Sequence, residues 1–181
     1  MTQFIIGTAQ FGMNYGIANS NGQPSESTIR EIIERAMESE IFYYDTAIAY
    51  GNSEEILGKI FEELRISQLV KIFTKIPKLT EASSLESILE HVGQSLSRLK
   101  IHQIFGLLLH SESDHLYLEG LSRIKEKDFC RYIGTSVGHD ALFNSELTKH
   151  PRLDLIQVPA NLLDRRNLIP EVLENSENKQ T

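Results

Sequence analysis

The sequence predicts an α/β domain in which helices cover a parallel sheet. The first observation is that short apolar runs alternate with amphipathic segments along the chain. The second is that the apolar runs are nearly continuous, which is typical of parallel strands buried on both faces. Strict alternation of strand and helix favours a parallel sheet. Two architectures fit this pattern, a doubly wound open sheet and a (β/α)8 barrel.

Six apolar runs are expected to form the strands. They are FIIGTA (4–9), IFYYD (41–45), VKIFTKI (70–76), IFGLLLH (104–110), YIGTSV (132–137) and LDLIQVPAN (153–161). A polar loop that contains glycine, NSNGQPS, separates the first run from the first amphipathic segment.

The segments between the runs have the apolar spacing of amphipathic helices, with stripes inside 29–37, 56–64 and 85–99. Asn52 with Glu55, and Ser83 with Glu86, are three residues apart, the spacing of a capping box. These pairs predict where two of the helices begin. We expect five helices between the six strands and a sixth that begins near Pro170.

Composition fits one soluble domain. The chain has 181 residues, of which 40% are hydrophobic and 24% charged. No linker or close repeat divides it, so we expect a single domain over 1–174 and a polar tail over 175–181. The formal charge of −7 argues against nucleic acid or an anionic membrane as a partner, because both require clustered Lys and Arg.

The sequence predicts a cytoplasmic protein. It contains no run of about 18 apolar residues, so no membrane span is expected. The N-terminus, MTQFIIGTAQ, lacks the basic start and long apolar region of a signal peptide. The single cysteine, Cys130, cannot form an internal disulfide, and we expect it to be buried as a small apolar residue.

Polar residues stand at the carboxyl ends of the expected strands, where both architectures place functional sites. Asp45, Lys75 and His110 end the second, third and fourth strands. The last two strands carry Thr135, Ser136, Gln157 and Asn161. Each also has a structural explanation, such as a turn, a lysine that reaches solvent or a hydrogen-bonded histidine. Neighbouring strands lie about 4.8 Å apart, so strands two to four, if adjacent, bring the first three residues into a patch roughly 10 Å wide.

With Tyr50, which follows the second strand, these side chains suit proton transfer to a carbonyl group. A phenol has a pKa of about 10, too high for efficient proton transfer at neutral pH. An ammonium such as Lys75 would lower that pKa, and a carboxylate such as Asp45 would hold the ammonium. A histidine could donate a hydrogen bond to a carbonyl oxygen that gains charge. No side chain supplies hydride, so reduction would require a nicotinamide cofactor.

Motifs for several other chemistries are absent. GTAQFG lacks the GxGxxG spacing of a Rossmann dinucleotide site, and no P-loop occurs. One cysteine and six scattered histidines give no zinc-binding set, so no metal site is expected.

The sequence resembles the aldo-keto reductase family, and it is similar to the bacterial members. The matching segments occur in family order over nearly the whole chain: IGTAQFG, YGIAN, DTAIAYGNSEEILG, TKIPK, LLLH, IGTSV and LIQVPANLLDRR. The segment around Asp45 and Tyr50 is highly specific, and the others are looser. The resemblance implies a (β/α)8 barrel and an NAD(P)H-dependent carbonyl reductase.

The resemblance also implies a role for each site residue. Tyr50 would donate the proton and Lys75 would lower its pKa. Asp45 would be the counter-ion of Lys75, and His110 would orient the carbonyl of a small-molecule substrate. Three residues match positions that hold the nicotinamide end of NADPH or NADH: Thr8, Ser136 and Gln157. Val137 stands where many members have an amide side chain, so that contact is not expected.

The chain is shorter than the resemblance requires. A barrel of this kind needs about 250 residues and eight strands, and we expect about six strands here. The prediction is therefore an incomplete (β/α)8 barrel with about six of eight βα units, truncated at its C-terminus. Strands seven and eight usually carry the phosphate-binding loops, so much of the cofactor site is expected to be missing.

Three functional hypotheses remain open. The chain is a carbonyl reductase whose barrel a second chain completes, a truncated remnant with little or no activity, or a non-catalytic interaction module. The first and last strands would have unpaired backbone groups at an open edge, which favours self-association or a completing chain.

Overall fold

The computed structural model describes residues 3–80, 83–111, 117–137, 150–161 and 163. Within these residues the chain forms a six-stranded sheet in which all paired strands run parallel. The strands are β1 (Ile5–Gly7), β2 (Tyr43–Asp45), β3 (Lys71–Lys75), β4 (Ile104–Leu109), β5 (Cys130–Ser136) and β6 (Leu155–Gln157).

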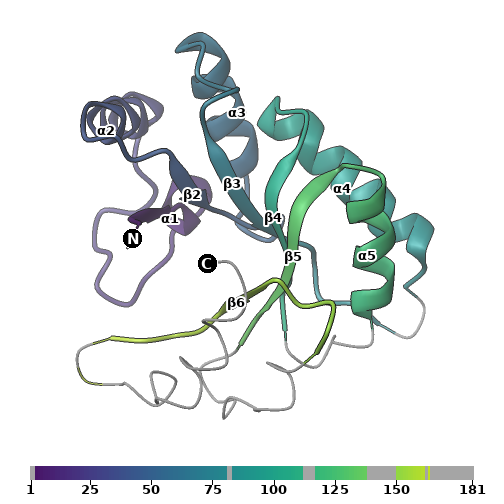
Figure 1. Cartoon of the computed structure of the whole chain (residues 1–181). Helices are drawn as coiled ribbons and strands as arrows, with labels where there is room; N and C mark the ends of the chain where they lie inside the picture. Colours follow the sequence, from purple (N-terminus) through teal and green to yellow (C-terminus); the bar gives the residue numbers. More distant parts are fainter. Residues whose placement is uncertain (1–2, 81–82, 112–116, 138–149, 162, 164–181) are drawn as a thin grey trace.

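The sheet is curled, and its strand order follows the chain order from β1 to β6 (Figure 1). A doubly wound sheet reverses its strand order at a switch point, so that alternative is wrong. Gln157 Nε2, at the end of β6, donates to Asp45 Oδ1 on β2 over 3.0 Å. In a flat sheet these strands would lie about 19 Å apart. The prediction of an incomplete barrel is therefore confirmed, and among the described residues β1 and β6 each pair on one side only.

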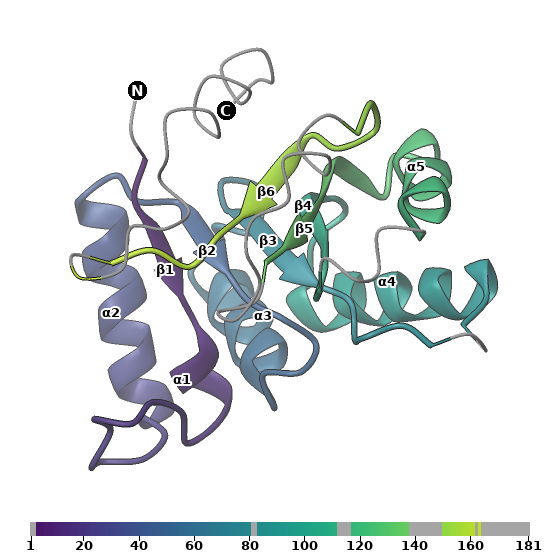
Figure 2. The same cartoon turned by 90° about the horizontal axis from the view of Figure 1, so that it is seen from below.

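Helices α2 to α5 lie along the outer side of the curled sheet (Figure 2). The helices are α1 (Ala9–Gly12), α2 (Glu26–Glu38), α3 (Ser53–Glu63), α4 (Leu85–Leu99) and α5 (Leu118–Glu126). The helix expected before the last strand, the helix near Pro170 and the tail over 175–181 lie outside the described residues. No helix in the described ranges is long and apolar enough to cross a membrane.

Strand side chains lie either on the outer face, under the helices, or on the inner face, because successive residues point to opposite faces of a sheet. Tyr44 faces the helices and is fully buried, with its ring 5.0 Å from that of Phe61 on α3. On the inner face the Phe105 ring contacts three half-buried rings, at centroid distances of 5.7, 5.3 and 5.2 Å, from Tyr43, Phe73 and Tyr132. The outer face is therefore a closed core, whereas the inner face is partly open.

The start of α4 differs from the sequence prediction. The Ser83–Glu86 capping box is wrong, because the box forms one residue later. Ser84 Oγ accepts from the N–H of Ser87, and Ser87 Oγ accepts from the N–H of Ser84. Ser83 Oγ instead accepts from the N–H of Thr80, at 2.9 Å. Competition between adjacent serines therefore decides the position of this helix start.

The start of α3 lies where the sequence predicts, but the predicted capping box is wrong. Asn52 is the N-cap, yet its side chain makes no capping hydrogen bond, so the box with Glu55 does not form. Asn52 Oδ1 accepts from Gln23 Nε2 at 3.0 Å, and Gln23 Nε2 also donates to the Phe11 carbonyl oxygen at 2.7 Å. A long-range contact from the first loop therefore replaces the local cap.

Four helices end in the same way, at a charged residue with left-handed backbone. These residues have φ between 53° and 64° and are Glu40, Arg65, Lys100 and Asp128. The N–H of the next residue bonds to the carbonyl oxygen five residues back, in the pairs Ile41–Ala36, Ile66–Phe61, Ile101–Leu96 and Phe129–Ile124. This is the Schellman motif, in which glycine is the usual left-handed residue. Helices α2 to α5 therefore share one way of turning toward the next strand.

Candidate active site

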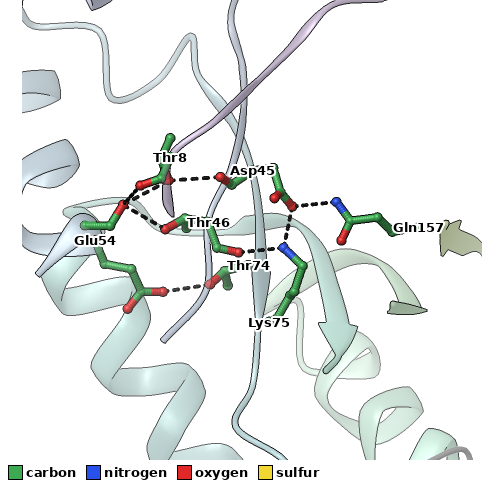
Figure 3. A network of polar contacts seen from close by, with 8 residues as sticks. Thr8, Asp45, Thr46, Glu54, Thr74, Lys75 and Gln157 are labelled. Carbon is green, nitrogen blue, oxygen red and sulfur yellow. Dashed lines mark hydrogen bonds and ion pairs between the residues drawn. The ribbon is translucent and has the colours of Figure 1, made fainter. Parts of the chain in front are cut away.

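Asp45 and Lys75 form a buried ion pair at the carboxyl end of the sheet (Figure 3). Asp45 is the last residue of β2, and Lys75 is the last residue of the neighbouring β3. Lys75 Nζ lies 2.6 Å from Asp45 Oδ1 and 3.1 Å from the carbonyl oxygen of Thr46. The side chain of Lys75 is 3% exposed and that of Asp45 is 15% exposed. The two strand ends thus place opposite charges together where the sequence predicts a site.

Burial and the ion pair act in opposite directions on Lys75. Removal from water lowers the pKa of Lys75, whereas the charge of Asp45 and its hydrogen bond raise it, and burial is the larger effect. An unpaired ammonium in this position would be strongly destabilising. Asp45 therefore favours the charged form of Lys75.

Tyr50 lies in the loop after β2, and its ring faces the ion pair. Lys75 Nζ is 5.2 Å from the centroid of this ring, a cation–π distance. Burial raises the pKa of Tyr50 to about 12, and the charges of Asp45 and Tyr15 add to the increase. Asp45, which lies 2.6 Å from the Lys75 ammonium, opposes a phenolate, and the lowering of this pKa by Lys75 stays a prediction.

Two glycines allow the Tyr50 loop to pack closely. A Cβ atom on Gly12 would lie 1.7 Å from the Tyr50 carbonyl oxygen, so a larger residue would displace the loop. Gly51 has a φ of +57°, and a Cβ there would lie 2.2 Å from the Gly12 carbonyl oxygen. The Tyr50 N–H donates to the Ala47 carbonyl at 3.0 Å, and the Tyr50 carbonyl accepts from the Ser53 N–H at 3.1 Å. The backbone on both sides of Tyr50 is therefore fixed.

Gln157 connects the last described strand with the ion pair. Its Nε2 donates to Asp45 Oδ1, whereas its Oε1 is buried and has no hydrogen-bond partner among the described residues. Buried polar atoms in proteins are usually hydrogen-bonded. Gln157 therefore offers an acceptor that a bound molecule could use.

The other three predicted residues occupy different positions around the pair. Thr8 is fully buried just after β1, and its Oγ1 donates to the Asp45 carbonyl oxygen at 2.9 Å. Ser136 ends β5 and is paired in register with Gln157. His110 directly follows β4, whose last residue pairs with the residue before Ser136. His110, Ser136 and Gln157 therefore stand at one level of the sheet, whereas Thr8 is covered on all sides.

Ser136 also lies within GTSVG (134–138), which has the GxSxG spacing of a hydrolase nucleophile. Such a serine sits on a strained turn between a strand and a helix. Here Ser136 is still part of β5 and pairs with Gln157, and its backbone has no positive φ. The geometry of Ser136 is therefore that of a strand residue and not of a nucleophile elbow.

Glu54, a buried carboxylate beside this site, was not predicted from the sequence. It is 2% exposed and accepts from Thr74 Oγ1 at 2.7 Å, Ser95 Oγ at 3.2 Å and Arg98 Nε at 2.8 Å. A signal for it was present, because Glu54 is three residues before the buried Leu57 and so shares the apolar face of α3. A carboxylate on such a face indicates a buried polar network.

Among the residues that the structure describes, no group of three or more His, Cys, Asp and Glu side chains could hold a metal ion. The groups at the strand ends are an ammonium–carboxylate pair, a phenol and an amide. Together they can hold a polar ligand and supply a proton to it.

The curled parallel sheet is that of an incomplete α/β barrel, and the candidate lysine–aspartate–tyrosine site lies at the carboxyl ends of its strands. A sequence model with the description "Aldo/keto reductase family" matches residues 3–179. The chain therefore belongs to the aldo/keto reductase family.

Solved structures with a similar fold include several aldo-keto reductases. A protein of Pseudomonas aeruginosa described as an aldo-keto reductase has a TM-score of 0.78 and 24% identity, over 96% of this chain and 68% of that chain. An aldo-keto reductase from Bacillus halodurans, in its holo form, has a TM-score of 0.75 and 24% identity, over 96% of this chain and 59% of that chain. A thermostable aldo-keto reductase in complex with the inhibitor epalrestat has a TM-score of 0.73 and 21% identity, over 97% and 64%. These matches support the fold, and this chain spans 59% to 68% of their lengths.

Proposed function

We propose that this protein reduces the carbonyl group of a small aldehyde or ketone with NADPH or NADH, and that Tyr50 donates the proton. The observation that carries the proposal is the buried Asp45–Lys75 ion pair against the Tyr50 ring. Buried ion pairs seldom add much stability. Titratable groups with perturbed pKa values at a strand end are typical of active sites. Family membership supports the same class of reaction.

The residues at the strand ends fit the nicotinamide end of such a cofactor. Its carboxamide has N–H donors, and Gln157 Oε1 is a buried acceptor without a partner among the described residues. Ser136 adds a hydroxyl group beside Gln157, at the same level of the sheet. When bound, the nicotinamide supplies the hydride that no side chain can supply.

Tyr50 would donate its phenolic proton to the substrate oxygen as negative charge develops there. A pKa of about 12 keeps Tyr50 protonated at neutral pH. Lys75, 5.2 Å from the ring centroid, would stabilise the phenolate that remains, and Asp45 holds Lys75 in place. His110, level with Ser136, would donate a second hydrogen bond to the carbonyl oxygen.

Titration with NADPH tests the proposal. We expect NADPH fluorescence to change when the protein binds it, and Gln157→Leu to raise the Kd about tenfold, as expected for one lost hydrogen bond. Tyr50→Phe should bind NADPH normally and abolish reduction, because it removes only the acid. Unchanged fluorescence even at millimolar protein would show that the isolated chain is no reductase.

We further propose that full activity requires two strands beyond β1 to β6. Among the described residues β1 and β6 each pair on one side only, and a closed barrel has eight strands. In this fold the loops after strands seven and eight usually carry the phosphate site. Completing strands would therefore tighten cofactor binding as well as cover the open edges.

Adding two βα units from a longer aldo-keto reductase tests this requirement. Carbonyl reduction should appear or rise in the completed protein, and its Tyr50→Phe variant should stay inactive. A folded, completed protein without activity would contradict the proposal and favour a remnant. A defined assembly of the isolated chain in sedimentation, without any reduction, would favour an interaction module.

A further inference from the structure

Glu54 is a buried carboxylate at the junction of three elements. It is the second residue of α3 and is 2% exposed. One carboxylate oxygen, Oε1, accepts from Thr74 Oγ1 on β3 at 2.7 Å. The other, Oε2, accepts from Ser95 Oγ and Arg98 Nε on α4, at 3.2 and 2.8 Å. A carboxylate that served only to stabilise the helix N-terminus would face solvent, so its burial requires another explanation.

Glu54 is linked to the candidate active site by one contact and by its place in the sequence. Thr74 directly precedes Lys75 in β3, so its bond to Glu54 fixes the strand where the ammonium side chain begins. On the other side Glu54 follows Ser53, whose N–H donates to the Tyr50 carbonyl at 3.1 Å. The Glu54 carboxylate therefore holds the strand beside Lys75 (Figure 3), and Glu54 stands next to the helix residue that bonds to the Tyr50 carbonyl.

Buried hydroxyl groups extend this arrangement to the backbone of Asp45. Ser53 Oγ is 2.9 Å from Thr8 Oγ1 and 3.1 Å from the Thr8 carbonyl, and it accepts from Thr46 Oγ1 at 3.1 Å. Thr8 Oγ1 donates to the Asp45 carbonyl at 2.9 Å, and the Thr46 carbonyl accepts from Lys75 Nζ at 3.1 Å. Because Thr8, Thr46 and Ser53 are all 0% exposed, water cannot easily replace these bonds.

We propose that Glu54 is a positioning residue that fixes Lys75 relative to the Tyr50 ring, acting through Thr74. Arg98, 2.7 Å from Glu54 Oε2, supplies the compensating charge. A carboxylate can accept from Arg98 and Thr74 at the same time, through its two oxygens. The expected effect of Glu54 on turnover rests on the proposed reductase function. The expected effect of Glu54 on the position of Lys75 does not.

Thr74→Val and Ser95→Ala form a matched pair of variants. Each removes one fully buried hydroxyl that donates to Glu54, but only Thr74 lies beside Lys75. We expect Thr74→Val to shift the NMR signals of the Lys75 ammonium and the Tyr50 ring, and Ser95→Ala to leave both in place. These signals require neither cofactor nor substrate, so they can be measured even if the chain is no reductase.

Glu54→Gln shows whether the effect of Thr74 passes through the carboxylate. The amide keeps the size of the side chain and one acceptor oxygen, but it loses the ion pair with Arg98. In the double variant with Thr74→Val, the Lys75 signals should shift no further than in the larger single variant, because coupled sites are not additive. Additive shifts, or an equal shift in Ser95→Ala, would overturn the proposal. A lower unfolding midpoint in all variants with unshifted Lys75 signals would also overturn it.

Kinetics of a completed, active protein give a second measurement. Thr74→Val should lower kcat by up to about 100-fold with little change in KM, because a misplaced acid affects the transition state more than substrate binding. Ser95→Ala should keep kcat close to its original value. A raised KM with unchanged kcat in Thr74→Val would exclude a positioning role for Glu54.

Discussion

At the scale of single residues, the Asp45 carboxylate affects three side chains: it accepts hydrogen bonds from two of them and raises the pKa of the third. Asp45 Oδ1 accepts from Lys75 at 2.6 Å and from Gln157 at 3.0 Å. The same charge raises the pKa of Tyr50. A substitution at Asp45 therefore removes an ion pair with Lys75, a hydrogen bond from Gln157 and a charge that raises the pKa of Tyr50.

Asp45→Asn should lower the pKa of Tyr50 from its value of about 12, because the charge that opposes the phenolate is lost. The pKa of Tyr44, also about 12, should not change, because burial alone raises it. A carbon-13 NMR titration of both tyrosine rings measures the two values in one experiment. An unchanged Tyr50 titration would mean that burial alone sets its acidity.

Tyr44→Phe should raise the free energy of unfolding by about 1 kcal/mol. The Tyr44 hydroxyl is buried without a partner among the described residues, and such groups cost about 1–3 kcal/mol. Tyr43→Phe is the control, since the Tyr43 hydroxyl accepts from Lys71 Nζ at 2.8 Å and its loss should not stabilise. Urea unfolding of both variants measures the difference. Equal effects would contradict the prediction.

Tyr44 should also contribute to alkaline instability. Its pKa is about 10 in the unfolded chain and about 12 in the folded protein, so the folded state binds the phenolic proton more tightly. Stability should therefore fall as the pH rises from about 10 to about 12, and Tyr44→Phe should reduce that fall. Urea unfolding of both proteins across this pH range measures the fall in stability.

At the scale of elements, strands and helix faces could be predicted because local apolar periodicity determines them. Helix ends could not, because Glu40, Arg65 and Lys100 adopt a left-handed backbone where glycine would be the sequence signal. The charges at the left-handed positions carry no information about φ. The apolar residues after them, which complete each Schellman motif, also occur inside strands.

Part of the candidate site could be predicted, because it depends only on which strands are neighbours. Asp45 and Lys75 end neighbouring strands, so the order of the strands alone brings them together. The contact between Gln157 and Asp45 depends on the curvature of the whole sheet, which no local pattern contains. The partners of Glu54 come from two other elements, β3 and α4, so its network also required the structure.

Gly58→Ala and Gly93→Ala test how closely α3 and α4 pack. A Cβ on Gly58 would lie 2.0 Å from the Arg98 carbonyl oxygen, whereas a Cβ on Gly93 would meet nothing within 4 Å. Gly58→Ala should destabilise the protein by about 1–3 kcal/mol, because the helices must separate. Gly93→Ala should stabilise it by about 0.5–1 kcal/mol, because alanine is the better helix former. Chemical denaturation measures both changes. A Gly58→Ala protein of unchanged stability would show that α3 and α4 can separate at little cost.

At the scale of the whole molecule, the described part of the curled sheet has β1 and β6 at its edges and a partly open inner face. Phe4 is 76% exposed and Ile5 is 48% exposed at the β1 edge. An edge strand presents unpaired N–H and C=O groups, which can pair with another chain. Apolar side chains beside such an edge favour that pairing, so the isolated chain should associate at high concentration.

Ile5→Lys should weaken this association, because a lysine on an edge strand opposes pairing with another strand. Leu69→Lys is the matched control, since Leu69 is similarly exposed, at 56%, in the turn before β3. Sedimentation across a range of protein concentrations measures the effect. Equal association in both variants would mean that the β1 edge is not the contact.

The four left-handed helix ends are positions where substitution by glycine could stabilise the protein. Each lies in the connection from a helix to the next strand, so all of them lie at the end of the sheet opposite Asp45 and Lys75. Glycine at these positions should raise the melting temperature, by relieving up to about 1 kcal/mol of strain each. The loops are separate, so the gains should add. Stabilising glycine substitutions at these helix ends could therefore offset destabilising substitutions made near Asp45 and Lys75 to change the chemistry of the site.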